Sequence, residues 1–178
     1  MKIVLIGIQG SGKSTQGNLL SKKLNIPYLS TGHIFRALAK EHTPLGRYIK
    51  ETMNAGSLIP DDKTLEIVSD YLARPEYQKG YILDGFPRTR VQAESFKNGI
   101  DYVFYINVSE EEALRRLSLR QDGRDDETEQ ALRKRLELFY KFTKPVIDYY
   151  KGKGILYEVN GERSIDKIHQ DISRILKI

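Results

Sequence analysis

The chain has 178 residues, of which 39% are hydrophobic and 30% are charged, and its net charge is +5, which together suit one compact domain with a polar surface. No apolar run approaches the roughly 20 residues of a membrane helix or forms a secretory signal, so we expect a cytoplasmic protein with no membrane partner. Cysteine is absent, which excludes disulfides, thiolate catalysis and cysteine-ligated zinc.

Short apolar runs bounded by glycine or proline alternate with longer segments of helical periodicity. The runs predict buried parallel strands at residues 3–6, 27–29, 81–83, 102–108 and 155–159. The periodic segments predict helices at residues 13–24, 65–72, 110–119, 129–142 and 164–176. This alternation predicts a three-layer α/β/α fold, in which helices cover both faces of a five-stranded parallel sheet.

The segment between the first predicted strand and helix is rich in glycine. Residues 7–14 fit the pattern G-x-x-x-x-G-K-[ST]. Glycines let successive backbone amides point at phosphate oxygens, and the helix N-terminus adds partial positive charge. The motif predicts binding of a nucleoside triphosphate, with the Lys13 ammonium near its β- and γ-phosphates. The candidate ATP-binding residues here are Gly10, Ser11, Gly12, Lys13, Ser14 and Thr15.

The stretch from residue 31 to about residue 72 has helical character and no intervening strand. It is too long for a simple crossover between strands, so we expect a small inserted helical unit. The strand that follows ends at Asp84, and a carboxylate at the carboxyl end of a central strand faces the ligand crevice. Asp84 and the Ser14 hydroxyl are therefore candidate ligands of Mg²⁺, partly through water.

Several further motifs follow in order. They are S-T-G-H-I-F-R at residues 30–36, G-S-L-I-P-D-D at 56–62 and D-G-F-P-R-T at 84–89, with Gln92 close behind. Together with residues 7–15, these segments resemble the adenylate kinase family over essentially the whole chain. The resemblance implies a P-loop NTPase-type kinase domain over residues 1–178 that catalyses ATP + AMP ⇌ 2 ADP with Mg²⁺. It also implies a nucleoside monophosphate-binding insert at residues 31–60 and a minimal lid, which closes over the phosphates, at residues 121–125. We expect a monomer, because the sequence gives no signal of an extended apolar surface.

The resemblance assigns an acceptor site to residues far from the phosphate loop. Arg36 and Arg88 would bind the α-phosphate of AMP, and a planar guanidinium suits a phosphate because it can donate two parallel hydrogen bonds. Gln92 would bind the edge of adenine through its amide. The same resemblance adds to the AMP site Thr31, Leu58, Gly85, Arg124 and Arg135. For Leu58 an ordinary core position is an equal alternative.

Phosphoryl transfer spreads negative charge over the phosphate oxygens, so catalysis depends on positioning and on cations. By resemblance, Arg116 packs on the donor adenine and Arg120 also binds ATP. The catalytic set that follows is Lys13, Asp84, Arg88, Arg120, Arg124 and Arg135. No general base is required, because an ionised acceptor phosphate already carries the attacking oxygen.

Three features depart from the family pattern, two single residues and the length of the lid. Ser14 stands where glycine is usual, and His33 stands where an aspartate is usual. We hypothesise that the Ser14 hydroxyl compensates for the missing carboxylate in metal binding. Only residues 121–123 separate Arg120 from Arg124, so closure would come from a short turn around Gly123 that swings inward.

Two other functions remain open. One is a kinase for another acceptor, namely UMP, CMP or a small metabolite. Ser14 favours the small metabolite, whereas Arg36, Arg88 and Gln92 favour an adenine nucleotide. A non-catalytic nucleotide-binding module is favoured by His33 and opposed by the set of arginines. The positive charge alone would suit nucleic acid, but no basic stripe interleaved with aromatic residues supports such a partner.

Overall fold

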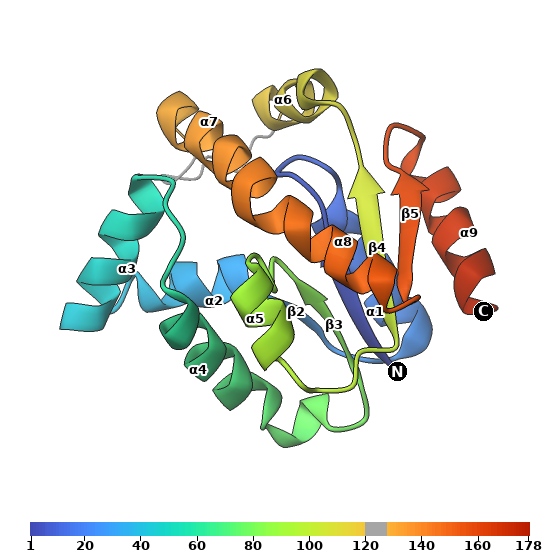
Figure 1. Cartoon of the computed structure of the whole chain (residues 1–178), viewed down its shortest axis with the longest axis horizontal. Coiled ribbons are helices and arrows are strands. Elements are labelled where there is room, and N and C mark those ends of the chain that lie inside the picture. Colours follow the sequence, from blue (N-terminus) through green and yellow to red (C-terminus); the bar gives the residue numbers. More distant parts are fainter. Residues whose placement is uncertain (120–127) are drawn as a thin grey trace.

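The computed structural model describes residues 1–119 and 128–178. Five parallel strands form one sheet in the order β2–β3–β1–β4–β5 (Figure 1). Their bounds are Lys2–Ile6 (β1), Tyr28–Ser30 (β2), Tyr81–Asp84 (β3), Tyr102–Asn107 (β4) and Leu156–Asn160 (β5). The predicted strands are confirmed, since each differs from the observed one by at most one residue at either end.

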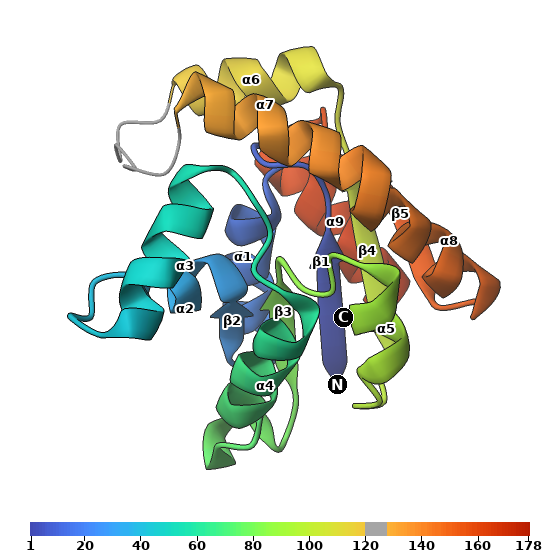
Figure 2. The same cartoon turned by 60° about the vertical axis from the view of Figure 1, so that its left-hand side comes forward.

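The described helices lie on both faces of this sheet, which confirms the predicted three-layer α/β/α fold (Figures 1 and 2). Helices α1 and α9 cover one face, and most of the others cover the opposite face. They are α1 (Lys13–Leu24), α2 (Thr31–Leu38), α3 (Pro44–Asn54), α4 (Asp61–Leu72), α5 (Arg90–Ser95), α6 (Glu110–Ser118), α7 (Glu129–Leu138), α8 (Lys144–Gly152) and α9 (Ile165–Leu176). Within the described ranges, no helix has both the length and the apolar character needed to cross a bilayer.

Strand β1 shows why the apolar runs are continuous rather than alternating. Ile3 and Leu5 face α1 and α9, whereas Val4 and Ile6 face the opposite helical layer, and all four side chains are buried. A strand that is covered on both faces needs apolar residues at every position. Each such side chain contributes about 2 kcal/mol by leaving water, so this central strand anchors both layers.

The carboxyl ends of the strands meet at one edge of the sheet. Strands β3 and β2 lie on one side of β1, and β4 and β5 lie on the other. The chain therefore reverses its direction of winding at β1, and ligands of open α/β sheets bind at such a point. The glycine-rich loop leaves β1 here, and Asp84 ends β3 beside it.

Between β2 and β3 the chain forms helices α2, α3 and α4 with no intervening strand, as the sequence predicts. The helix expected over residues 129–142 consists of α7 and a π-helical turn, Phe139–Thr143, which leads into α8. Pro145 follows this turn and cannot donate a backbone hydrogen bond, which gives a reason for the irregularity. Helices α5 and α8 were not expected from the sequence. The predicted lid at residues 121–125 lies outside the described residues.

Candidate active site

A cavity of about 220 Å³ opens at the carboxyl edge of the sheet. Its walls come from the glycine-rich loop, α2, the segment before α4, the loop after β3, and α6 and α7. The structure brings to this cavity most of the predicted site residues, namely Gly10, Gly12, Lys13, Ser14, Arg36, Leu58, Asp84, Gly85, Arg88, Gln92 and Arg135. Arg120 and Arg124 were also predicted to bind nucleotide, and both lie outside the described residues.

The glycine-rich loop has the backbone conformation that its sequence requires. Gly10 and Gly12 have φ of +88° and +93°, a region that side chains other than glycine rarely adopt. A Cβ on Gly10 would also lie 2.5 Å from the carbonyl oxygen of Ala113 in α6. The Lys13 ammonium donates to the carbonyl oxygens of Gly7 and Ile8, at 2.8 Å each. The ammonium is therefore bound to the backbone on the inner side of the loop. Thr15, which was also predicted to bind ATP, has an exposed side chain and does not line the cavity.

Asp84 has a neighbour that the sequence did not indicate. Its carboxylate Oδ2 accepts a hydrogen bond of 2.6 Å from the hydroxyl of Tyr28 in β2. Thr31, which begins α2, donates to the carbonyl oxygen of Gly85 at 2.9 Å and is fully buried. Thr31 thus joins the start of α2 to the end of β3, and it is not among the residues that line the cavity.

The two arginines predicted to bind the acceptor phosphate lie beside glycines. A Cβ on Gly32 would lie 3.3 Å from the Arg36 guanidinium, and one on Gly85 would lie 3.2 Å from that of Arg88. The Arg88 Nε donates to the Gly85 carbonyl at 2.8 Å. Glycine at these positions leaves room for both guanidinium groups at the edge of β2 and β3.

Gln92 is almost completely buried, with 2% exposed surface, and its amide has a partner on each side. Its Oε1 accepts from the Arg88 backbone amide at 2.7 Å, and its Nε2 donates to an oxygen of Asp61 at 2.8 Å. Asp61 was not indicated by the sequence. The S/T-x-x-E/Q spacing of Thr89 and Gln92 is typical of a helix-capping box and signals only the start of α5, which Thr89 caps.

Arg135 extends from α7 to two other parts of the site. One of its guanidinium nitrogens donates to the side-chain oxygen of Gln9 in the phosphate loop, and the other donates to the Met53 carbonyl in α3, both at 3.1 Å. Gln9 was not among the predicted residues. A guanidinium that connects the loop to the helical insert has the position expected of a group that contacts phosphates on both sides.

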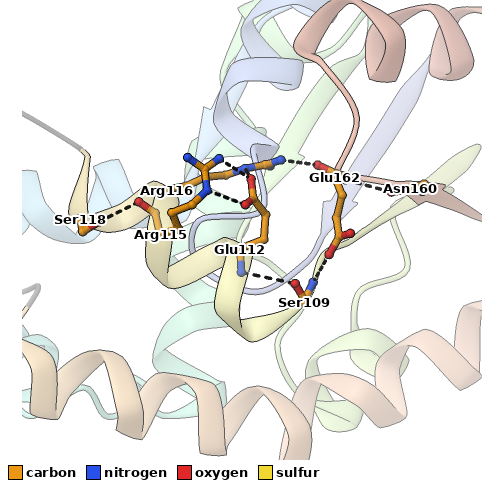
Figure 3. Close-up of polar contacts among 8 residues, drawn as sticks. Ser109, Glu112, Arg115, Arg116, Ser118, Asn160 and Glu162 are labelled. Carbon is orange, nitrogen blue, oxygen red and sulfur yellow. Dashed lines mark hydrogen bonds and ion pairs between the residues drawn. The ribbon is translucent and has the colours of Figure 1, made fainter.

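Figure 3 shows the contacts of Arg116 in α6. Its Nε donates to Glu112 at 2.6 Å and its NH2 donates to the Gly161 carbonyl at 2.8 Å. Hydrogen bonds from Arg115 and Arg116 lower the pKa of Glu112 to about 2. A Cβ on Gly12 would lie 3.9 Å from Arg116, so this guanidinium is beside the phosphate loop although it does not line the cavity. Glu112 and Gly161 were not among the predicted site residues.

The candidate metal ligands Asp84 and Ser14 both offer oxygen atoms, which Mg²⁺ prefers. Among the described residues no group of three or more histidine, cysteine, aspartate or glutamate side chains gathers at one point. Mg²⁺ that accompanies a nucleotide needs only one or two protein carboxylates, since phosphates and water supply its other ligands. Asp84 and Ser14 line the same cavity, so the residues present fit this mode of binding.

Comparison with known proteins relates the chain to one family. The family model described as adenylate kinase matches residues 5–155. An adenylate kinase of Clostridium botulinum (strain Loch Maree / Type A3) is 41% identical over 212 aligned residues, covering 99% of this chain and 98% of that protein. Adenylate kinases of Oceanobacillus iheyensis and Geobacillus sp. (strain WCH70) are 38% and 37% identical, again over 99% of this chain and 99% and 98% of their own lengths. These alignments are longer than the chain itself, so the relatives contain segments that it lacks.

Proposed function

The chain belongs to the adenylate kinase family of nucleoside monophosphate phosphotransferases, and we propose that it transfers the γ-phosphoryl group of ATP reversibly to AMP, with Mg²⁺, to give two ADP. One observation carries the proposal. A single cavity is lined both by Lys13 of the phosphate loop and by Arg36 and Arg88, the two arginines predicted to bind the acceptor phosphate. Two anionic nucleotides that meet end to end need two such positively charged sites.

In this mechanism the loop amides and the Lys13 ammonium bind the β- and γ-phosphates of ATP. Arg36 and Arg88 bind the phosphate of AMP and turn one of its ionised oxygens toward the γ-phosphorus. Arg135, which contacts both the loop and α3, stabilises the charge that spreads over the transferred group. Residues 31–60 would form the acceptor-binding insert, and closure of the site over the nucleotides would exclude water.

Asp84 and Ser14 would bind the Mg²⁺ that accompanies ATP, Asp84 partly through water. When it is bound, this ion neutralises phosphate charge and helps to orient the triphosphate. The Tyr28 hydroxyl fixes the orientation of the Asp84 carboxylate, so one carboxylate oxygen is committed to the protein. His33 is exposed and lines the cavity where the family usually has an aspartate, which leaves Asp84 as the carboxylate at the carboxyl end of β3.

A panel of acceptors tests the proposed reaction. With ATP and Mg²⁺, AMP is expected to give the highest kcat/KM among AMP, GMP, CMP and UMP in an assay of ADP release, and omission of Mg²⁺ is expected to abolish most of the rate. The highest kcat/KM with CMP or UMP would move the assignment to a pyrimidine nucleotide kinase. Binding of ATP and AMP without ADP formation would instead identify a nucleotide sensor.

The pair formed by Glu112 and Arg116 gives a prediction for the donor site. In Glu112→Ala the Arg116 guanidinium loses one of the two partners that it has among the described residues, and KM for ATP is expected to rise by about threefold, as for other partly exposed ion pairs. KM for AMP should stay constant. Arg115→Ala is the matched control, because it removes the other partner of the same carboxylate but leaves Arg116 in place.

The pH dependence of this pair follows from the lowered pKa of Glu112, about 2 instead of 4.5. A lowered pKa means that the contribution of the pair is complete above the unfolded value and is lost as the pH falls through about 2. Glu112 therefore does not titrate between pH 8 and pH 5. Over this range the pH dependence of KM for ATP should have the same shape in the unmodified enzyme and in Glu112→Ala. An inflection that this substitution removes would contradict the assignment.

A further inference from the structure

The orientation of the Gln92 amide is determined by two partners of opposite character. The Arg88 backbone amide can only donate, so it requires the Gln92 oxygen, at 2.7 Å. The Asp61 carboxylate can only accept, so it requires the Gln92 nitrogen, at 2.8 Å. Exchange of the oxygen and the nitrogen would place donor against donor and acceptor against acceptor. The amide therefore has one permitted orientation rather than two.

We propose that Asp61 is a positioning residue that, by fixing this amide, makes the acceptor site select 6-aminopurines such as adenine over 6-oxopurines such as hypoxanthine. The inference rests on the proposed function, in which Gln92 binds the acceptor base. Asp61 does not touch the nucleotide in this scheme. It acts through Gln92, which lines the cavity, whereas Asp61 lies in the first turn of α4 behind it.

The contacts of Asp61 suit this role. The same Asp61 oxygen, Oδ1, accepts from Gln92 and from the Thr89 hydroxyl, which lies 2.9 Å away. The Thr89 hydroxyl in turn accepts from the backbone amide of Gln92. The side chain and the backbone of Gln92 are thus both fixed by this pair. Asp61 begins α4, and the segment before α4 connects it to α3. The hydrogen bonds of Asp61 therefore also join the Gln92 amide to the helical insert.

The chemistry of the bases turns a fixed amide into selectivity. An amide has two hydrogens on nitrogen and two lone pairs on oxygen, so the two contacts within the described structure leave one of each for a ligand. Adenine presents a donor at N6 beside an acceptor at N1, and a 6-oxopurine presents an acceptor beside a donor. A glutamine that is free to turn can bind either edge, but a glutamine in one orientation binds only one of them.

The experiment compares AMP with IMP, which differ at the 6-position and in protonation at N1. The ratio of kcat/KM for AMP to kcat/KM for IMP is measured, because partial loss of folded enzyme cancels in it. In Asp61→Ala the Arg88 backbone amide still favours one orientation, so the ratio is expected to fall severalfold, by less than the roughly tenfold discrimination of a correctly paired bidentate contact. In Asp61→Asn the ratio should stay near that of the unmodified enzyme, because the asparagine oxygen can still accept from Gln92.

Asp62→Ala is the matched control. It removes the same charge from the same first turn of α4, but its side chain is exposed, and the ratio should not change. If Asp61→Ala does not fold, Asp61→Ser replaces it, because serine stays polar in this half-buried first turn while its hydroxyl ends one bond short of the carboxylate oxygen that accepts from Gln92.

Gln92→Ala distinguishes the role of Asp61 from the proposed binding of the base by Gln92. If Gln92→Ala lowers the ratio and Asp61→Ala does not, the role of Asp61 is refuted while the proposed function stands. If Gln92→Ala also leaves the ratio unchanged, Gln92 does not bind the base, and both the inference and that part of the proposed function are wrong. An equal loss in Asp61→Asn and Asp61→Ala would refute the hydrogen-bond explanation.

Discussion

Lys13→Met is expected to lower kcat by about 100-fold to 1,000-fold, the usual cost of removing a group that stabilises charge developing in the transition state. The side chain keeps a similar length, so the substitution removes the ammonium with little change in volume. In the protein this ammonium is bound to the carbonyl oxygens of Gly7 and Ile8, at the loop that would surround the phosphates. The measurement is the steady-state rate of ADP formation at saturating ATP and AMP.

Lys22→Met provides the control for this prediction. Lys22 lies in the same helix, α1, and is exposed, so its replacement removes an equal charge far from the cavity. Its kcat should remain within about twofold of the unmodified enzyme, as for most surface substitutions. A similar decrease in both variants would mean that the net charge of α1, and not the position of the Lys13 ammonium, supports the rate.

Arg88→Lys should lower kcat/KM for AMP by about 1,000-fold, which is the lower range found when an arginine that stabilises phosphoryl transfer is lost. Lysine keeps the positive charge but cannot donate two parallel hydrogen bonds to a phosphate. It also loses the bond from Nε to the Gly85 carbonyl, which orients the guanidinium at the end of β3. Kinetics with AMP varied at saturating ATP would measure the effect, and KM for ATP should change little.

Arg90→Lys is the matched control for Arg88→Lys. Arg90 is two residues away, but its side chain is 54% exposed and forms an ion pair with Glu94. A change of less than about twofold is expected there. If Arg88→Lys were equally mild, Arg88 would not bind the acceptor phosphate, and the proposed acceptor site would keep only Arg36 of its two arginines.

Much of the fold follows from local sequence. The central strand β1 was predicted because both faces of the sheet are covered there, so Ile3 to Ile6 are apolar at every position. Helices α5 and α8 were missed for different reasons. Helix α5 has only six residues, too few to show a helical pattern of apolar residues, and it begins after a threonine cap. Helix α8 continues directly from a π-helical turn, so no side-chain cap or break between helices marks its first residue.

The candidate site was predicted where a motif specifies the local backbone. Gly10, Gly12 and Lys13 belong to one loop, whose conformation depends on neighbouring residues and on left-handed glycines. The residues that form hydrogen bonds with the predicted site residues, such as Tyr28, Asp61 and Glu112, were not predicted. Among them, Glu112 had a local signal, since it precedes Arg116 by four residues on one helix face.

The sequence by itself determined the alternation of strands and helices, the phosphate loop and the types of residue that bind phosphate, because these depend on short-range periodicity and on backbone freedom. Only the tertiary structure decided which side chains meet. Asp61 binds Gln92 across 31 positions, Gly161 binds Arg116 across 45 and Gln9 binds Arg135 across 126. Such contacts arise where separate elements pack against one sheet, and the order in which the strands lie is fixed by the whole core and not by any single segment.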